Sequence, residues 1–154
     1  NYVVRYSDCV SAPAPYNIRL TNVWSGKVLT STGSQNNAEV RAQPYDASWN
    51  SQIWIVQAVG KDFSQIILKN LSMSKFLNSE TNAENSRALT YELHADWLGQ
   101  EWKIETISGS SQVRIKNVWT GKYLTVTDTG NYSQITLQTL NTGWTSQRWN
   151  LQKL

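Results

Sequence analysis

The motif Trp-x-x-Gln-x-Trp occurs three times in this 154-residue chain, with nearly constant spacing. Its glutamines are Gln52, Gln100 and Gln147, so successive copies lie 48 and 47 residues apart (100 − 52 and 147 − 100). Six of the eight tryptophans belong to these motifs. A repeat of this length inside one domain-sized chain indicates a protein built from three related units.

The repeat continues on both sides of the motif. Each unit starts with two alternating apolar residues and an asparagine, passes through a turn to Lys-x-Leu, and ends with the motif and one more apolar residue. The units span about 16–62, 63–110 and 111–154, and residues 1–15 stand outside the pattern. We therefore expect a single domain over 16–154, preceded by a non-repeating N-terminal segment. The repeated asparagines are Asn22, Asn70 and Asn117.

Apolar and polar residues alternate with a period of two, which predicts β-strands. Ile18 and Leu20 alternate with polar neighbours in the first unit, as do Ile135 and Leu137 in the third. Turns that contain glycine separate these runs, and no stretch has helical periodicity. We expect four short strands per unit, hence twelve. Such units predict an all-β barrel capped by hairpins, because closure removes exposed sheet edges, and three blades are too few for a propeller.

Composition limits the classes of function. The chain is 40% hydrophobic and 16% charged, and it is rich in Asn, Gln, Ser and Thr, so its surface should interact mainly through hydrogen bonds. The net charge of +3 includes no basic stripe, which argues against nucleic-acid binding. No apolar run approaches the roughly 18 residues that cross a bilayer, so we expect no membrane span.

The N-terminal segment raises the question of a partner chain. The first residue is Asn1 rather than Met, and we expect a processed or partial chain in a secreted or extracellular location. Cys9 is the only cysteine, which excludes an internal disulfide bond. It is either an ordinary half-buried thiol or a tether to a partner chain, because it precedes Pro13 and Pro15 outside the repeats.

Catalytic and metal-dependent chemistry finds little support. His94 is the lone histidine, and no Gly-x-Ser-x-Gly elbow accompanies it. His, Cys and carboxylate residues do not cluster as metal ligands, and no glycine-rich phosphate loop occurs. A glycosidase with paired carboxylates stays open, although no pair stands out. We expect a non-enzymatic protein with no cofactor and no catalytic or metal-binding residues.

The second half of the motif predicts structure. Trp54, Trp102 and Trp149 share the phase of the apolar residue two positions later, so they should face the barrel interior. Burial of three indoles contributes strongly to folding, at roughly 25 cal/mol per Å². The glutamines share this phase, and we expect them to bind backbone groups where loops meet the barrel, because a buried amide needs partners.

Three Gln-x-Trp motifs, each closing one unit, resemble the ricin-B-type lectins, a family of β-trefoils. The resemblance covers residues 16–154 and implies a β-trefoil fold and carbohydrate binding. It also implies sugar sites made of an Asp near the end of the second strand, an aromatic platform on the third strand and an Asn before the Gln. Such sites suit a sugar because polar groups take hydroxyls while the ring stacks on C–H groups.

The chain departs from this pattern in every unit. In unit order, the position of the Asp holds Thr30, Asn78 and Thr125. The position of the aromatic platform holds Gln43, Glu92 and Gln138, if the second unit is shifted by one residue. The position of the Asn holds Ser51, Gly99 and Ser146. The usual galactose contacts are therefore absent, which leaves glycan binding to other residues.

Each unit also has a tryptophan outside the family pattern, three residues before the Gln: Trp49, Trp97 and Trp144. These residues lie in polar loops near the usual pocket, and Tyr45 and His94 take corresponding places in the first two units. The tryptophans are either substitute sugar platforms or staples that close each loop onto the next unit. The first interpretation gives as candidate carbohydrate-binding residues Thr30, Tyr45, Trp49, Asn50, Asn78, His94, Asp96, Trp97, Thr125 and Trp144.

Trp24 and Trp119 lie in turns that contain glycine, with Met73 at the matching place, and form a second, separate candidate surface. The preferred hypothesis is a lectin whose partners are glycans or glycoproteins, with up to three weak sites that gain strength by avidity. This would suit agglutination, defence or toxin delivery. The alternatives are a protein-binding or protease-inhibiting trefoil, and the receptor-binding end of a larger toxin or enzyme. The sequence leaves the oligomeric state open.

Overall fold

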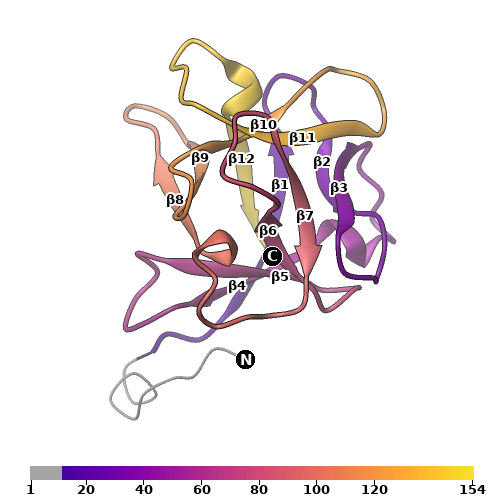
Figure 1. The fold of residues 1–154 in the computed structure, drawn as a ribbon. Coiled ribbons are helices and arrows are strands. Elements are labelled where there is room, and N and C mark those ends of the chain that lie inside the picture. Colours follow the sequence, from indigo (N-terminus) through magenta and orange to yellow (C-terminus); the bar gives the residue numbers. More distant parts are fainter. Residues whose placement is uncertain (1–11) are drawn as a thin grey trace.

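The computed structural model describes residues 12–154, so Cys9 and its suggested role as a tether lie outside the described residues. Figure 1 shows the twelve strands that the alternation predicts, together with three short 3-10 helices that it does not predict. The elements are β1 (Tyr16–Asn22), β2 (Val28–Ser31), β3 (Ala38–Gln43), η1 (Asn50–Gln52), β4 (Trp54–Ala58), β5 (Ile66–Asn70), β6 (Phe76–Ser79), β7 (Ser86–Tyr91), η2 (Leu98–Gln100), β8 (Trp102–Thr106), β9 (Gln112–Asn117), β10 (Tyr123–Val126), β11 (Ser133–Gln138), η3 (Thr145–Gln147) and β12 (Trp149–Lys153).

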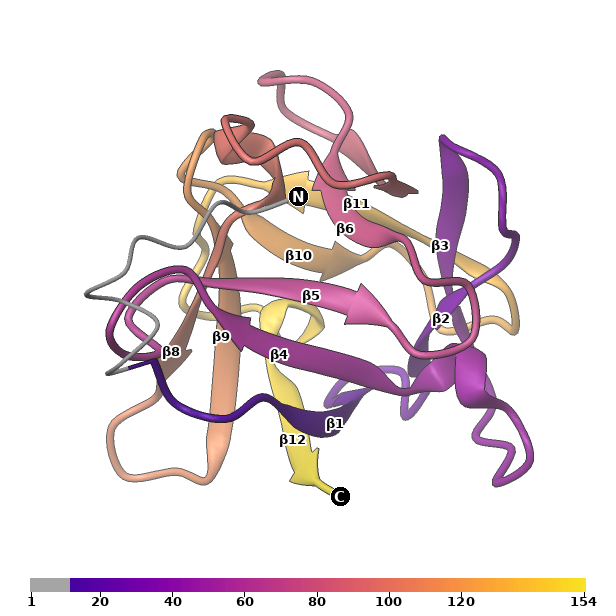
Figure 2. The same cartoon turned by 90° about the horizontal axis from the view of Figure 1, so that it is seen from below.

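Six strands close a barrel. β1 pairs with β12 and β4, β5 pairs with β4 and β8, and β9 pairs with β8 and β12, all antiparallel. Figure 2 shows β4 and β5 lying side by side in this ring. Closure gives each barrel strand two neighbours, which removes free edges. The same apolar pairing recurs in each unit: Leu20 with Leu151, Val56 with Leu68, and Ile104 with Ile115.

Three hairpins cap the barrel. They are formed by β2 and β3, β6 and β7, and β10 and β11. The second strands of the hairpins, β3, β7 and β11, also pair with one another around the pseudo-threefold axis. A six-stranded barrel with three capping hairpins is a β-trefoil, so the predicted fold class is confirmed. None of the helices among residues 12–154 has the length and apolar character needed to span a membrane.

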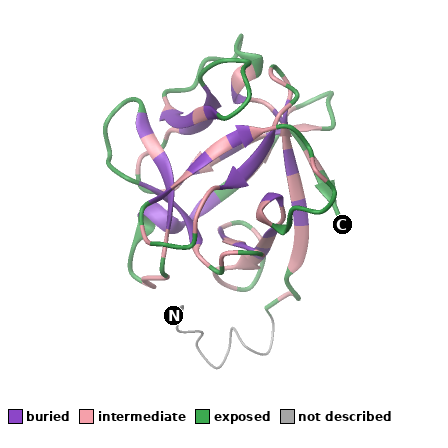
Figure 3. Ribbon diagram, turned by 90° about the vertical axis from the view of Figure 1, so that its right-hand side faces the viewer, coloured by how far each residue is buried: buried purple, intermediate pink, exposed green. Residues whose placement is uncertain are grey.

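The second tryptophan of each motif lies in the core, as predicted. Trp54, Trp102 and Trp149 are each 0% exposed, and Figure 3 shows that the buried segments lie along the strands. Each indole N–H donates to a carbonyl in the hairpin of the same repeat. The acceptors are Leu29 (3.0 Å), Leu77 (3.0 Å) and Leu124 (3.2 Å). The indole thereby buries its apolar surface and still satisfies its one polar group.

The motif glutamines bind backbone, which confirms the second prediction. Gln52 donates from Nε2 to the carbonyl of Pro44 at 2.8 Å and accepts at Oε1 the backbone N–H of Asp46 at 3.0 Å. Gln100 and Gln147 make the same two kinds of bond. The glutamine therefore closes the loop that carries the first tryptophan of the motif.

The repeated asparagines join neighbouring repeats. Asn70 donates from Nδ2 to the carbonyl of Ser51 at 2.9 Å, while its Oδ1 accepts the N–H groups of Ser72 and Met73. The other two asparagines make the same contact to the 3-10 helix of another repeat, Asn117 with Gly99 (3.0 Å) and Asn22 with Ser146 (2.9 Å). Each turn between the first and second strand of a repeat is thus fixed against the 3-10 helix of another repeat.

Candidate functional site

Three related pockets open where the turn of one repeat meets the 3-10 helix of another. We name them by the repeat that supplies the helix: the repeat 1 pocket beside Trp49, the repeat 2 pocket beside Trp97 and the repeat 3 pocket beside Trp144. Their volumes are about 470, 470 and 560 Å³. These values fall within the roughly 300–1,000 Å³ typical of small-molecule sites.

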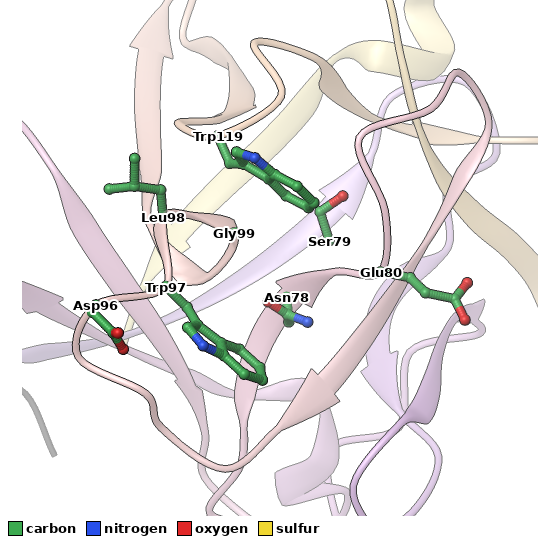
Figure 4. Close-up of a pocket in the computed structure, with 8 residues that line it drawn as sticks. All are labelled: Asn78, Ser79, Glu80, Asp96, Trp97, Leu98, Gly99 and Trp119. Atoms are coloured by element: carbon green, nitrogen blue, oxygen red, sulfur yellow. The ribbon is translucent and has the colours of Figure 1, made fainter.

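Each pocket lies between two large side chains from different repeats. In the repeat 2 pocket, Trp97 and Trp119 lie on opposite sides, as Figure 4 shows. Trp144 and Trp24 line the repeat 3 pocket in the same way, and Met73 takes the second place opposite Trp49 in repeat 1. The expectation of a separate surface for Trp24 and Trp119 is therefore wrong: the inter-repeat asparagine bonds bring both turns to the pockets.

The first tryptophans of the motif are half exposed. Trp49, Trp97 and Trp144 have 40%, 38% and 43% of their surface accessible, whereas the second tryptophans have none. The rings thus pack partly against their loops and still present apolar surface to solvent. Exposed indole surface beside polar groups provides the stacking platform that sugar rings require.

The floor of each pocket is a buried polar residue at the second strand of its repeat. In repeats 1 and 3 it is Thr30 and Thr125, whose hydroxyl groups accept the Nε2 of the motif glutamine at 3.2 Å. The same hydroxyl groups donate to a backbone carbonyl two residues earlier. Asn78 takes this place in repeat 2, and its amide has no hydrogen-bond partner among residues 12–154.

His94 supports Trp97 from behind. The two rings stack with centroids 3.9 Å apart and an interplanar angle of 11°, and Tyr91 packs against Trp97 at 5.1 Å. The stacked imidazole covers one face of the indole, so only the opposite face can contact a ligand in the pocket. This stacking restricts the rotation of Trp97 before any ligand arrives.

The hydrogen bonds correct two assignments made from sequence. The backbone N–H of His94 donates to the motif glutamine, as do those of Asp46 and Asn141, so His94 corresponds to these residues and not to Tyr45. Tyr45 instead stacks under the guanidinium of Arg19, 4.6 Å from its ring centroid, and lines none of the three pockets.

The platform position of repeat 2 is also one residue earlier than expected. Tyr91 pairs with Phe76 just as Gln43 pairs with Val28 and Gln138 with Tyr123. No shift is needed, and Glu92 is not the equivalent residue. Repeat 2 therefore keeps an aromatic residue at this position, packed against Trp97.

Eight of the ten candidate residues line the pockets. They are Thr30, Trp49 and Asn50 in repeat 1, Asn78, Asp96 and Trp97 in repeat 2, and Thr125 and Trp144 in repeat 3. His94 supports Trp97, and Tyr45 lies elsewhere.

Sequence reasoning missed Tyr132, which lines the repeat 1 pocket from the β10–β11 turn. It is 50% exposed and has a φ of 65°, a left-handed conformation that is unfavourable for a bulky residue. The matching turns hold Asn37 and Asn85, which tolerate this conformation better. A tyrosine at a turn position that otherwise holds asparagine was the available signal. Repeat 1, which has Met73 in place of a turn tryptophan, thus gains another aromatic residue.

Two carboxylates, Glu80 and Asp96, line the repeat 2 pocket. Glu80 accepts two bonds from the guanidinium of Arg87, at 2.7 and 2.9 Å, and these bonds are the main cause of its lowered pKa. A glycosidase acid needs a raised pKa, so Glu80 has the opposite property. No group of three or more His, Cys, Asp or Glu residues within 12–154 could hold a metal ion.

The fold is similar to that of several solved proteins, whereas no family model and no curated protein matches the sequence. The designed threefold-symmetric protein ThreeFoil has a TM-score of 0.82 at 20% identity, over 90% of this chain and 99% of that one. The exo-β-1,3-galactanase 1,3Gal43A from Clostridium thermocellum has a TM-score of 0.82 at 24% identity, over 92% of this chain but only 31% of the galactanase. A ricin B-like lectin from Macrolepiota procera, solved with lactose, has a TM-score of 0.75 at 22% identity, over 90% and 95% of the two chains. The structural neighbours of this β-trefoil thus include ricin B-like lectins, at low sequence identity.

Proposed function

We propose that this protein is a lectin, which binds glycans in its three pockets and catalyses no reaction on them. The observation that carries the proposal is an arrangement of side chains that occurs in all three pockets. A half-exposed indole lies opposite a large side chain of another repeat, and a buried polar residue lies at the base of the pocket between them. An indole stacks on the C–H groups of a sugar, and nearby amide and hydroxyl groups bind its hydroxyls. The lectin of Macrolepiota procera, solved with lactose on the same fold, supports this proposal.

Three sites on one rigid barrel favour multivalent binding. Each pocket is open to solvent and encloses only part of a sugar ring, so a single sugar gains little affinity from it. Simultaneous binding of two or three pockets to a dense glycan surface raises the apparent affinity by orders of magnitude. We therefore infer binding to glycans displayed on glycoproteins or surfaces rather than to free monosaccharides.

The pocket chemistry supports binding without catalysis. The linings of the repeat 1 and repeat 3 pockets contain no carboxylate among the described residues. In the repeat 2 pocket, hydrogen bonds from Arg87 lower the pKa of Glu80. The general acid of a glycosidase needs a raised pKa, and the shift of Glu80 has the opposite direction.

A glycan array followed by titration of three variants tests the proposal. We expect the wild-type protein to bind a defined group of glycans, and Trp49→Ala, Trp97→Ala or Trp144→Ala to weaken that binding without loss of the folded state. Tyr45→Ala is the matched control, because Tyr45 is an exposed aromatic residue outside the pockets. Absence of binding to every glycan, together with tight binding to a protein such as a protease, would replace the lectin by a protein-binding trefoil.

A further inference from the structure

The repeat 2 pocket differs from the other two at three positions that lie close together. It has Asn78 where the others have Thr30 and Thr125, Gly99 where they have Ser51 and Ser146, and His94 where they have Asp46 and Asn141. Repeats 1 and 3 agree in kind at all three places. The differences of repeat 2 are therefore concentrated around one cavity.

Gly99 links two of these differences. A Cβ atom on Gly99 would lie 3.2 Å from Oδ1 of Asn78 and 3.2 Å from Cε3 of Trp119. Both distances are tighter than ordinary van der Waals contact. The missing side chain therefore lets the asparagine amide and the indole approach the helix η2 together.

Asn78 offers an unused amide to the pocket. The residue is only 8% exposed, and its side chain has no hydrogen-bond partner among residues 12–154. In repeat 3, by contrast, the Thr125 hydroxyl is bound by both Gln147 and the Tyr123 carbonyl. Because the Asn78 amide faces the pocket and is not bonded to any of the described residues there, it is free to bond to the hydroxyls of a ligand. Figure 4 shows Asn78 beside the ring of Trp97, with Trp119 across the pocket.

The two indoles of this pocket are each fixed by neighbouring residues. Trp97 stacks on His94, and Trp119 packs against Gly99 in a turn that Asn117 ties to η2. Aromatic walls on both sides are a stronger constraint on a ligand than a single platform. They require a ring that is apolar on both faces, because a hydroxyl pressed against an indole loses its water without gaining a hydrogen bond.

We propose that the repeat 2 pocket is the principal sugar site and holds a pyranose of all-equatorial, gluco-type configuration between Trp97 and Trp119, with Asn78 bonded to hydroxyls at the ring edge. In such a sugar, both faces carry only axial hydrogens. Galactose carries one axial hydroxyl, which makes one of its faces polar. This inference deepens the proposed lectin function and rests on it.

A titration with two epimers tests the stereochemistry. Methyl β-glucopyranoside and methyl β-galactopyranoside differ only in the orientation of one hydroxyl, and the indole N–H signals of Trp97 and Trp119 report binding by NMR. We expect the glucoside to bind roughly 2- to 10-fold more tightly, the equivalent of one aromatic contact. Equal or tighter binding of the galactoside at these signals would overturn the inference and leave the lectin function intact. If neither these sugars nor any arrayed glycan binds, the proposed function itself fails.

Replacement of Asn78, at the base of the repeat 2 pocket, tests whether this residue binds the sugar. Asn78→Thr installs the residue of the other repeats, and its hydroxyl can bind Gln100 as Thr125 binds Gln147. We therefore expect an unchanged or higher Tm and a roughly 2- to 10-fold loss of glucoside affinity. The reciprocal control, Thr125→Asn, should leave the Trp97 and Trp119 titration unchanged. Glucoside affinity that survives Asn78→Thr, or that falls with Thr125→Asn, would contradict the role of Asn78.

Gly99→Ser gives an independent test of the two walls. The added side chain should displace Trp119, and the glucoside should lose its advantage over the galactoside. Far-ultraviolet circular dichroism and Tm check that the barrel is retained. A folded variant that keeps the full preference for the glucoside would show that Trp119 is not a wall of the site.

Discussion

The two tryptophans of each motif are five residues apart and have opposite environments. Trp54, Trp102 and Trp149 are fully buried and make the same bond to a leucine carbonyl in every repeat. Trp49 and Trp97 are about two-fifths exposed and face different partners, Met73 in one pocket and Trp119 in another. The comparison separates a repeated interior, which a closed barrel requires, from a repeated surface position whose neighbours vary.

The varying neighbours come from outside the repeat that carries the tryptophan. The turn opposite Trp97 belongs to repeat 3, because Asn117 fixes it to the 3-10 helix of repeat 2. Residues of other repeats can therefore change one pocket without changing the barrel strand beside it. Threefold architecture thus gives three similar positions that can acquire different specificities.

Replacement of one tryptophan from each set should give the largest contrast. We expect Trp102→Ala to lower the free energy of unfolding by about 3–5 kcal/mol, since it leaves a large cavity and an unpaired Leu77 carbonyl. Trp97→Ala should cost only about 1–2 kcal/mol, because its ring is two-fifths exposed and loses mainly its contacts with His94 and Tyr91. Urea denaturation of both variants measures the difference. If both variants lose a similar free energy of unfolding, the two tryptophans do not differ in role, and Trp97 is a structural residue that holds its loop on the barrel.

The interior could be predicted from the sequence because it depends on short-range patterns. Alternation placed the strands, and the phase of Trp54 and Gln52 relative to Val56 predicted their burial. Each of these properties is set by residues a few positions apart in the chain. The barrel and the role of the Gln-x-Trp motif therefore followed from the chain alone.

The pockets could be predicted only in part, because they join segments far apart in the chain. The partnership of Trp24 with Trp144 depends on the bond from Asn22 to Ser146, which spans 124 residues. The assignments of Tyr91, the last residue of β7, and of His94, in the loop after it, were wrong by one residue, because the alternation that fixes register ends where the strand ends. Their correct register became clear from the hydrogen bonds to the motif glutamines.

The next prediction concerns the loop that connects the two environments. Gln147→Ala removes the partners of the Asn141 N–H and the Thr139 carbonyl, and we expect a loss of about 1–3 kcal/mol in the free energy of unfolding. Thermal and urea unfolding measure it. Gln152→Ala is the control, since Gln152 is exposed, and should change stability by less than about 0.5 kcal/mol. Equal effects would contradict an architectural role for the motif glutamine.

A smaller effect should arise from the support behind the repeat 2 platform. His94→Ala removes the ring stacked on Trp97, an interaction worth about 0.5–1.5 kcal/mol. We expect a Tm shift of a few degrees at most and a several-fold loss of affinity for the best glycan of the array, because Trp97 is no longer held in place. Leu140→Ala, which alters an exposed side chain of the repeat 3 loop, should leave the affinity unchanged. Unaltered glycan affinity in His94→Ala would show that Trp97 needs no support.

The smallest effect should come from the charges between the cap and the repeat 2 pocket. Arg87 binds Glu80 at 2.7 Å and Glu39 at 3.1 Å, and arginine hydrogen bonds are the main cause of the lowered pKa of both carboxyls, from Arg41 for Glu39 and from Arg87 for Glu80. A carboxyl group with a lowered folded pKa adds stability above its unfolded value, and this stability is lost as the pH falls through the folded value. Because these groups are partly exposed, we expect Arg87→Met to cost only about 0.2–1 kcal/mol at pH 7 and low salt. The difference between wild type and variant should shrink below about pH 4.5 and in high salt. A difference that stays constant between pH 7 and pH 3 would show that Arg87 acts through packing rather than charge.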